Sequence, residues 1–439
     1  MPYRSISRRQ FVAASTAIPL LAPAIQIRAA GDPSQKIRLA VIGVAARGRA
    51  NLNAVAQEAI VALCDVDEAR AADARNRFPS ARFFTDYRRM FDTFGNQFDG
   101  VVISTPDHQH ALPALIAMSR GKHVYCEKPL AHSVSEVRAM RDAAAKAKVV
   151  TQMGTQIHAG ENYRRVVEIV QAGLLGQVRR VHVWCQRKPD AMKRIAPPRP
   201  GVSFDPDLWI GPAPTEFFYA SGPSKNAWPH FDWRWWWEFG GGVLADMACH
   251  FMDLPFWALQ LTSPNSVTAK GTPTAGGDNS TMPATMQVDY QFPATSNRPA
   301  VHLTWYHGVT GPDLSGQRTF PGFSDGLLFE GEKGQLVANY GKYQILPEAF
   351  ARDFTPPPPT IPKSIGHHRE WLEAIRHGGT PLCHFGYAGN LAEAVLLGNV
   401  AYRAGTPIHW DAMAGKITDQ PKANTFLSRP IRQGWEAPS

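Results

Sequence analysis

The sequence contains few cysteines and no pair of them at a metal-binding spacing. Its five cysteines among 439 residues are odd in number, and no two form a C-x-x-C pattern. A disulfide-stapled scaffold and a zinc ribbon are therefore not expected, although an oxidising compartment would permit one incidental bridge. The cysteines are Cys64, Cys126, Cys185, Cys249 and Cys383.

Dense runs of lysine and arginine are also missing from the body of the chain. The formal net charge is +9, from 46 Lys and Arg against 37 Asp and Glu, but residues 1–30 supply four arginines and no acid. Without that segment the formal charge is +5, and no later cluster is typical of a nucleic-acid surface. We expect no nucleic-acid partner.

The chain lacks the composition of a disordered or fibrous protein. Hydrophobic residues make up 44% and charged residues 19%, which is typical of a globular protein with a large core. The length is about three times the ~150 residues of a typical domain, so two domains are expected and three are possible.

The chain lacks an apolar run long enough to span a membrane, even in its N-terminal segment. That segment instead has the pattern of an export signal. Paired arginines precede Phe11, an apolar stretch runs from residue 12 to 27, and small residues follow at 29–31. This pattern resembles the twin-arginine signal. The alternative, a membrane anchor, is weakened because Pro19 and Pro23 interrupt a segment shorter than the ~20 residues of a span. We expect residues 1–30 to direct export to the periplasm or another extracytoplasmic space, and no stable membrane span.

From residue 36 onward, short apolar runs alternate with helical patterns, which is typical of a parallel sheet built from βαβ units. The expected strands are 37–42, 59–63, 100–104, 122–126 and 149–154, and the expected helices are 49–57, 69–77, 111–119 and 133–147. A doubly wound parallel sheet is therefore predicted to end near residue 155.

Beyond that point the pattern changes to one helix, 161–172, followed by strand-like segments without intervening helices, at 177–186, 285–292, 300–307 and 326–340. Such segments favour a large, mostly antiparallel open sheet. The Pro-rich stretch 354–362 is expected to be a linker, and helices at 368–376 and 390–404 are expected to pack back on the body.

A glycine-containing loop follows the first expected strand and precedes a helix, with the pattern G-x-A-x-x-G over residues 43–48. Gly43 permits a tight turn, Gly48 permits close packing of helix on strand, and the helix N-terminus offers N–H groups to a pyrophosphate. Ala45 places a methyl group where the backbone should approach the phosphates.

An acid ends the second expected strand, as dinucleotide binding requires. Asp65 stands 22 residues after Gly43, where a carboxylate accepts hydrogen bonds from the adenosine ribose. It would repel a 2′-phosphate, so NAD is favoured, while Arg47 and Arg49 keep NADP open. The alternative is an ordinary turn with a solvated Asp65.

Two further motifs follow the expected strands 100–104 and 122–126, at the edge where open α/β sheets bind ligands. They are Thr105-Pro106-Asp107-His108-Gln109-His110 and Cys126-Glu127-Lys128-Pro129. A functional role is expected for Lys128, although a lone lysine is often a solvated surface amine.

A third motif begins with three glycines at 240–242 and opens a helix. Asp246 and His250 are four residues apart and therefore share a helix face, and Asp253 follows three residues later. The spacing could hold a metal, but no other His/Cys pair is spaced to complete the ligand set, so no metal is expected. A packing role is the alternative for His250.

Taken in order, these motifs resemble the glucose–fructose oxidoreductase / inositol dehydrogenase / MocA (Gfo/Idh/MocA) family. The resemblance continues through residues 153–156, the Trp-rich segment and residues 396–399, and covers nearly all of the chain after the signal. It implies an α/β protein with an NAD-binding Rossmann domain, here 31–155. A second α/β domain with a large, mostly antiparallel open sheet would follow at 156–439, including C-terminal helices within 365–410.

The resemblance also implies an NAD-dependent sugar oxidoreductase in which Lys128, Asp246 and His250 surround a sugar or cyclitol carbon. His250 would take the hydroxyl proton, Lys128 would stabilise the alkoxide, and Asp246 would orient His250 or bind a neighbouring hydroxyl. The expected cofactor-binding residues are Gly43, Ala45, Arg47, Gly48, Asp65, Thr105, Pro106, His108, His110, Glu127, Lys128 and Gln156.

Five of the twelve tryptophans lie within ten positions, 228–237. Aromatic faces stack on sugar rings, so one or two of these rings are expected to meet substrate, while packing or an oligomer interface is the alternative. The expected substrate-binding residues are Lys128, His158, Tyr163, Arg164, Trp235, Asp246 and His250.

Export adds a constraint, because an extracytoplasmic space is not expected to supply free nicotinamide, so NAD should stay bound through the cycle. Either a second carbonyl compound re-oxidises the cofactor, or transient oxidation and elimination hydrolyse a glycoside without net redox change. The second route resembles the NAD-dependent α-N-acetylgalactosaminidases. A non-catalytic sugar-binding protein is a third possibility, and the resemblance implies a homo-oligomer, a dimer or a tetramer.

Overall fold

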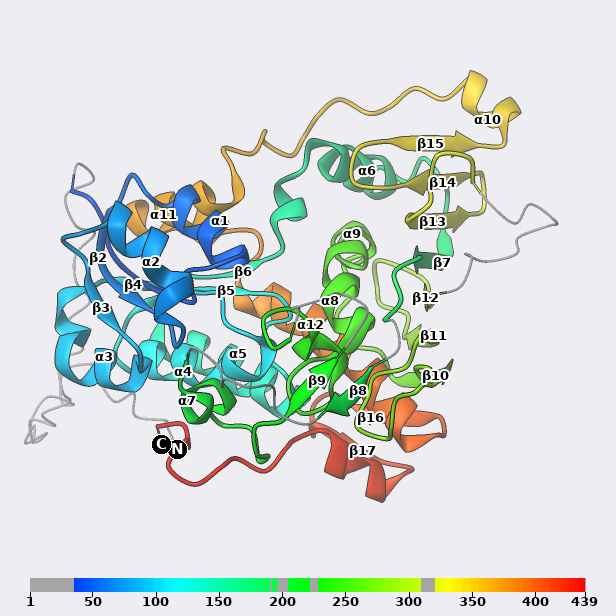
Figure 1. Cartoon of the computed structure of the whole chain (residues 1–439). Coiled ribbons are helices and arrows are strands. Elements are labelled where there is room, and N and C mark those ends of the chain that lie inside the picture. Colours follow the sequence, from blue (N-terminus) through cyan, green and yellow to red (C-terminus); the bar gives the residue numbers. More distant parts are fainter. Residues whose placement is uncertain (1–34, 190–191, 196–203, 222–227, 309–319, 439) are drawn as a thin grey trace, which may run out of the picture.

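Two β-sheets stand side by side with helices between them (Figure 1). The structure, a computed structural model, describes residues 35–189, 192–195, 204–221, 228–308 and 320–438. The expected export signal, 1–30, lies outside these residues. Within them, no helix is long and apolar enough to cross a membrane.

The first sheet has six parallel strands in the order β3-β2-β1-β4-β5-β6, the order of a Rossmann fold. The predicted doubly wound sheet is therefore confirmed. Its strands are β1 (Arg38–Ile42), β2 (Ala59–Cys64), β3 (Arg82–Phe84), β4 (Gly100–Ile103), β5 (His123–Glu127) and β6 (Thr151–Gly154). The connecting helices are α1 (Arg47–Ala54), α2 (Glu68–Arg77), α3 (Tyr87–Phe94), α4 (Ala111–Ser119) and α5 (Val134–Ala147).

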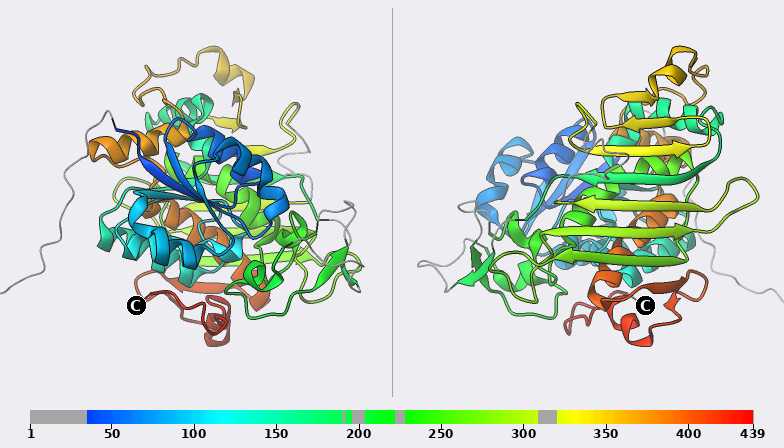
Figure 2. Two further views of the ribbon diagram at one scale, coloured as in Figure 1. Left: turned by 60° about the vertical axis from the view of Figure 1, so that its left-hand side comes forward. Right: turned by 90° about the vertical axis from the view of Figure 1, so that its right-hand side faces the viewer.

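The second sheet has nine strands in the order β15-β14-β13-β7-β12-β11-β10-β16-β17, and only the β7–β12 pair is parallel. The predicted large, mostly antiparallel sheet is confirmed. Its strands are β7 (Val178–Cys185), β10 (Ser266–Thr272), β11 (Thr285–Phe292), β12 (Val301–His307), β13 (Gly326–Gly331), β14 (Gln335–Ala338), β15 (Tyr343–Leu346), β16 (Ile408–Asp411) and β17 (Lys416–Ile417). One face of this sheet carries no helix among the described residues (Figure 2).

The segment 326–340, expected as one long strand, forms two strands joined by a turn. The amide of Gly331 donates to the carbonyl of Gly334 at 3.0 Å, and β13 then pairs with β14 in antiparallel register. The apolar residues on both sides of the turn gave a continuous hydrophobic pattern that concealed it.

The remaining elements lie between the sheets or around them. They are α6 (Glu161–Gln171), α7 (Pro206–Ile210), α8 (Gly242–Phe251), α9 (Asp253–Ala258), α10 (Glu348–Arg352), α11 (His367–His377) and α12 (Phe385–Ala404), with a hairpin of β8 (Lys193–Ile195) and β9 (Tyr219–Ser221). Five short 3-10 helices complete the described chain, at Gly95–Gln97, Asp107–Gln109, Gln156–Ala159, Asp232–Trp235 and Pro421–Phe426.

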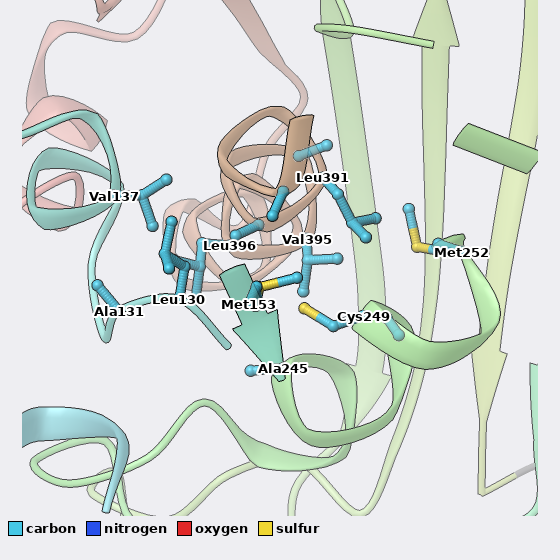
Figure 3. Packing of buried hydrophobic residues seen from close by; sticks show 14 of the residues in the cluster. Leu130, Ala131, Val137, Met153, Ala245, Cys249, Met252, Leu391, Val395 and Leu396 are labelled. Carbon is cyan, nitrogen blue, oxygen red and sulfur yellow. The ribbon is translucent and has the colours of Figure 1, made fainter. Parts of the chain in front are cut away.

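Helix α12 joins the two halves of the molecule because it is apolar on nearly every side. It contacts α5 of the first half and both α8 and β10 of the second. Figure 3 shows Leu391, Val395 and Leu396 of this helix between the side chains of Val137 and Cys249. A helix buried on all sides in this way fixes α8 against the strands of the parallel sheet.

Helix α11 reaches from the C-terminal half back to the first sheet, and the Pro-rich stretch that precedes it is bound to α6. Trp371 of α11 is buried with Val41 and Val102, so this helix packs on the parallel sheet. The Pro-rich stretch has no regular structure, and the carboxylate of Glu168 in α6 accepts the amides of Thr360 and Ile361 at 2.6 and 2.7 Å. We propose that residues 31–155 and 156–439 are the two domains, with α11 docked on the first.

Candidate active site

A cleft of about 870 Å³ opens at the carboxyl ends of the parallel strands, and α8 forms its opposite wall. This is the edge where ligands of open α/β sheets bind, and the volume lies within the range of ligand pockets. The turn after β1, the ends of β2, β4 and β5, and the Asp246 face of α8 all line the cleft.

The turn between β1 and α1 is held close to its neighbours. The amide of Gly43 donates to the carbonyl of Cys64 at 2.8 Å, and Gly43 has φ +79°, a conformation that favours glycine. A Cβ at Gly48 would stand 1.9 Å from the carbonyl oxygen of Gly43, so only glycine allows this approach. Gly43, Ala45 and Arg47 line the cleft, whereas Gly48 lies beneath the turn as packing.

Asp65 follows β2 and lines the cleft with its carboxylate fixed from two sides. The amides of Val44 and Asp67 donate to it at 2.9 and 3.0 Å. Burial raises the pKa of this carboxyl, and the two backbone donors oppose the rise. The carboxylate is therefore positioned at the place where a ribose diol of a dinucleotide binds.

The ends of β4 and β5 contribute Thr105, Pro106, Glu127 and Lys128 to the lining, together with Gln156 after β6. Oε1 of Glu127 accepts hydrogen bonds from Asn51 at 2.9 Å and from Gln156 at 2.7 Å. A Cβ at Gly154 would collide with Glu127, so this glycine leaves space for the carboxylate. The expected residues of these strand ends thus converge on one region.

His108 and His110, which we expected to bind cofactor, are buried and do not line the cleft. The ring of His108 is hydrogen-bonded to the carbonyl of Trp209 at 2.9 Å. The ring of His110 lies between two carbonyl oxygens, 2.7 Å from Pro129 and 2.8 Å from Thr105. Their hydrogen bonds shape the loops around the cleft instead.

Lys128 and Asp246 form a buried ion pair at the centre of the cleft. Nζ of Lys128 donates to Oδ1 and to the main-chain oxygen of Asp246, each at 2.7 Å, and the two side chains are 12% and 8% exposed. The adjacent cations hold the pKa of Asp246 well below its usual range in spite of its burial. The carboxylate of Asp246 therefore stays ionised, and the Lys128 side chain lines the cleft.

Two arginines that the sequence patterns did not indicate complete this cluster. Arg187, just after β7, donates to Oδ2 of Asp246 at 3.0 Å, and Arg234 donates to Oδ1 at 3.2 Å. Both line the cleft. Arg187 follows a strand and Arg234 lies within the Trp-rich segment, and neither belongs to a recognisable motif. Only the tertiary fold brings them to Asp246.

His250 lies one turn after Asp246 in α8 and also lines the cleft. Its ring has no hydrogen-bond partner among the described residues. Burial and the nearby Lys128 lower its pKa to about 3. The imidazole is therefore neutral near pH 7 and free to accept a proton from a bound hydroxyl.

Asp107 is a second buried acid in the lining of the cleft. It belongs to the motif of residues 105–110, but the sequence patterns predicted no function for it. It is 5% exposed, and burial raises its pKa to about 7 in spite of Arg234 and Lys128 nearby. It lines the cleft together with these two cations. Its charge therefore changes near neutral pH.

Four residues expected to bind substrate lie outside the lining of the cleft. His158 is 1% exposed and bonded to Asp253 at 2.9 Å, and Tyr163 donates to the main-chain oxygen of His250 at 3.1 Å. Arg164 is paired with Glu370 at 2.9 Å, and Trp235 is buried while Trp233 lines the cleft in its place. These side chains are engaged in the core, so they support the site from behind.

The described residues contain no group of three or more His, Cys, Asp and Glu side chains placed to hold a metal ion. All five cysteines are buried as free thiols. Asp246 is surrounded by cations, which is the opposite of a metal-ligand environment.

The cleft fits a dinucleotide. The strand order, the glycine turn that a Cβ would obstruct, and the fixed carboxylate of Asp65 are the features that such a cofactor requires. Arg47 at the start of α1 adds a cation near the place for the pyrophosphate.

Comparison with known proteins agrees with this fit. Residues 37–155 match the model of the Gfo/Idh/MocA oxidoreductase family, described as an oxidoreductase family with an NAD-binding Rossmann fold. An inositol 2-dehydrogenase of Salmonella typhimurium is 27% identical over 152 residues, 33% of this chain and 45% of that protein. A glycosyl hydrolase family 109 protein of Saccharopolyspora erythraea is 34% identical over 163 residues, 34% of either chain.

These alignments span less than half the length of the curated relatives. A solved structure extends the likeness to both halves of the fold. The WlbA dehydrogenase from Bordetella pertussis, solved with NADH and UDP-GlcNAcA, has a TM-score of 0.59 and 19% identity, covering 86% of this chain and 99% of that one. The matched Rossmann segment, residues 37–155, belongs to the Gfo/Idh/MocA family of oxidoreductases, and the motifs and the fold of the described chain agree with that match.

Proposed function

We propose that this protein oxidises a secondary hydroxyl of a sugar or cyclitol with NAD as the hydride acceptor. The observation that carries the proposal is the meeting of Lys128, Asp246 and His250 in the cleft that also contains the dinucleotide turn. The inositol 2-dehydrogenase relatives support the substrate class.

NAD, when bound, supplies the acceptor for the hydride that leaves the carbinol carbon. The neutral imidazole of His250 takes the hydroxyl proton, because its low pKa leaves the ring unprotonated. Two of the three N–H donors of Lys128 are directed to oxygens of Asp246, which leaves one for the developing alkoxide. Asp246 holds the ammonium in place through both its carboxylate and its main-chain oxygen.

We further propose that NAD stays bound between turnovers, because side chains of the C-terminal half line the same cleft as the nucleotide turn. Trp209, His230 and Trp233 line the cleft together with Asp65 and Arg70 of the Rossmann domain, and His230 lies 3.5 Å from Asp67. Nε2 of Gln109 donates to the carbonyl of Trp209 at 2.6 Å, which links the Rossmann domain to this part of the C-terminal half.

The C-terminal tail makes further hydrogen bonds to both halves of the molecule. Nη2 of Arg429 donates to the carbonyl of His108 at 2.6 Å and to Glu136 at 2.9 Å, and the amide of Arg432 donates to the carbonyl of Pro212 at 3.1 Å. Purified protein, denatured without added cofactor, should release about one NAD per chain. Release of no nicotinamide would contradict retention, and the NAD to NADP ratio in the extract tests the preference that Asp65 supports.

The sequence of residues 1–30 supports a periplasmic or other extracytoplasmic location reached by the twin-arginine pathway. Replacing Arg8 and Arg9 together with lysine should leave the protein in the cytoplasm of a twin-arginine-competent host. Unchanged export of that variant would contradict this route.

A homo-oligomer is also proposed, because one face of the nine-stranded sheet carries no helix among the described residues (Figure 2). Analytical ultracentrifugation should give a dimer or a tetramer, and a monomer at micromolar concentration would contradict it.

Redox-neutral glycoside hydrolysis is a second candidate, favoured by the relative named glycosyl hydrolase family 109 protein. The same Lys128 and His250 would serve its oxidation step. Incubation with nitrophenyl glycosides and no added cofactor separates the two: aglycone release favours hydrolysis, and oxidation of a free sugar favours the dehydrogenase.

A further inference from the structure

Cations outnumber acids where the substrate of the proposed dehydrogenase would lie. Lys128, Arg187 and Arg234 all contact the single carboxylate of Asp246. Two further acids line the cleft nearby: Glu127, whose Oε1 accepts from Asn51 and Gln156, and Asp107, whose pKa burial raises to about 7. The cluster of Lys128, Arg187, Arg234 and Asp246 therefore carries an excess of two positive charges.

The two guanidinium groups also have donors that remain unused. Among the described residues Arg187 makes one side-chain hydrogen bond, through Nη1, and its side chain is 47% exposed. Arg234 uses Nε on Asp246 and Nη1 on the carbonyl of Phe231, which leaves its Nη2 unbonded within the described residues. Binding to Asp246 therefore uses only some of the N–H donors of Arg187 and Arg234.

This excess positive charge does not lie where the pyrophosphate of the cofactor would bind. The glycine turn and Arg47 form that end of the cleft at the start of α1, whereas Arg187 and Arg234 are bound to α8 beside His250. Asp325, on the loop before β13, accepts from the amide of Gln186 at 2.7 Å but forms no ion pair with Arg187 within the described residues.

We propose that the substrate is an anionic sugar, whose carboxylate or phosphate group is bound by Arg187 and Arg234 while its reacting hydroxyl meets His250. The inference rests on the proposed function and names the substrate class for the same site. A guanidinium fork matches the geometry of both anions, and a charge-assisted pair in a partly buried cleft is stronger than one in water.

Direct binding measurements on the cofactor-loaded protein test the inference. Isothermal titration should compare uronates of gluco, galacto and manno configuration with their neutral parent sugars, and with the corresponding 6-phosphates. At least one acidic sugar should bind about 10-fold or more tightly than its neutral parent. A preference for uronates over phosphates, or the reverse, identifies which anion the arginines bind.

Arg187→Gln should weaken binding of the acidic sugar about 10-fold and change binding of its neutral parent less than about 2-fold. Because this side chain is half exposed, folding should be retained and can be checked by thermal melting. Arg179→Gln, the same change on an exposed arginine of β7 paired with Glu332, is the matched control and should alter neither affinity.

Equal affinity for acidic and neutral sugars would overturn the inference, as would equal losses for both in Arg187→Gln or no binding of any acidic sugar. NADH absorbance recorded on the same mixtures tests the proposed function separately. Anion-selective binding without NADH formation would contradict the dehydrogenase but uphold the anion site.

Discussion

Nζ of Lys128 donates at 2.7 Å to both the carboxylate and the main-chain oxygen of Asp246, which links the end of β5 to α8 across the cleft. The ammonium is therefore held by the wall that carries His250. In the proposed oxidation this lysine would stabilise the developing alkoxide, so its loss should affect turnover more than cofactor binding.

Lys128→Met should lower kcat/KM by on the order of 100-fold to 1,000-fold and change NAD affinity less than about threefold. Steady-state kinetics with excess NAD and fluorescence titration of the cofactor measure the two quantities. Lys146→Met, on the exposed face of α5, provides the matched control and should retain wild-type values. Equal losses of kcat/KM in both variants would refute the role of Lys128.

His250 should make the reaction insensitive to mild acid. Its pKa is lowered to about 3, so the ring remains the neutral base as pH falls from 8 to 5, and kcat/KM should show no inflection near pH 6.5 that depends on it. His250→Gln should reduce kcat by on the order of 100-fold or more at every pH in this range. An acid limb near pH 6.5 that disappears in the variant would contradict this assignment.

Asp107 should control how binding of an anionic sugar depends on pH. Its pKa is raised to about 7, and Lys128, Arg234 and Asp246 face it, so the cleft gains a negative charge as pH rises through 7. Affinity for an acidic sugar should therefore fall between pH 6 and 8, and neutral sugars should show little change. In Asp107→Asn the acidic sugar should bind equally well at both pH values, which calorimetry at pH 6 and pH 8 can measure.

The approach of α1 to β1 should tolerate no side chain at position 48. Gly48→Ala places a Cβ 1.9 Å from the Gly43 carbonyl oxygen, and we expect a loss of about 1–3 kcal/mol in the free energy of unfolding together with weaker NAD binding. Gly379→Ala is the control, because the nearest atom to its Cβ would be 3.7 Å away. Urea titrations that gave equal stability for the two variants would count against this packing.

Buried neutral histidines should make the fold sensitive to acid. The pKa of His367 is lowered to about 3 by burial, while the unfolded chain binds a proton near pH 6.5. Its contribution to stability is therefore complete above pH 6.5 and is lost progressively as pH falls toward 3. His367→Gln should flatten the slope of unfolding free energy against pH between 6 and 4, whereas an unchanged slope would show that other groups dominate.

Local patterns predicted the parallel sheet well, because βαβ units repeat an apolar strand and a capped helix. Strand β11 begins and ends where the pattern placed it, and α4 does as well. The patterns indicated neither β3 nor α3, since a strand of three residues has too little alternation to detect. Helix α12 begins at Phe385, five residues before the predicted start, because Gly386 and Gly389 weaken the helical pattern.

The site was predictable only where its residues belong to motifs. Lys128, Asp246 and His250 come from short patterns and meet in one cleft. Arg187 and Arg234 reach Asp246 only through the tertiary fold, so no local pattern marks them. His158 illustrates the opposite case: a polar residue after a strand end became a core group because Asp253, on another helix, satisfies its ring.

Oxidation of a sugar in this cleft by retained NAD should be visible in the absorbance of the purified protein alone. Mixed with a panel of acidic and neutral sugars and no added cofactor, the wild-type protein should show the NADH band at up to one equivalent per chain. His250→Gln should bind the same sugar without that band. If the protein contains NAD and binds sugar yet never forms NADH, the cleft does not oxidise sugars with its own cofactor.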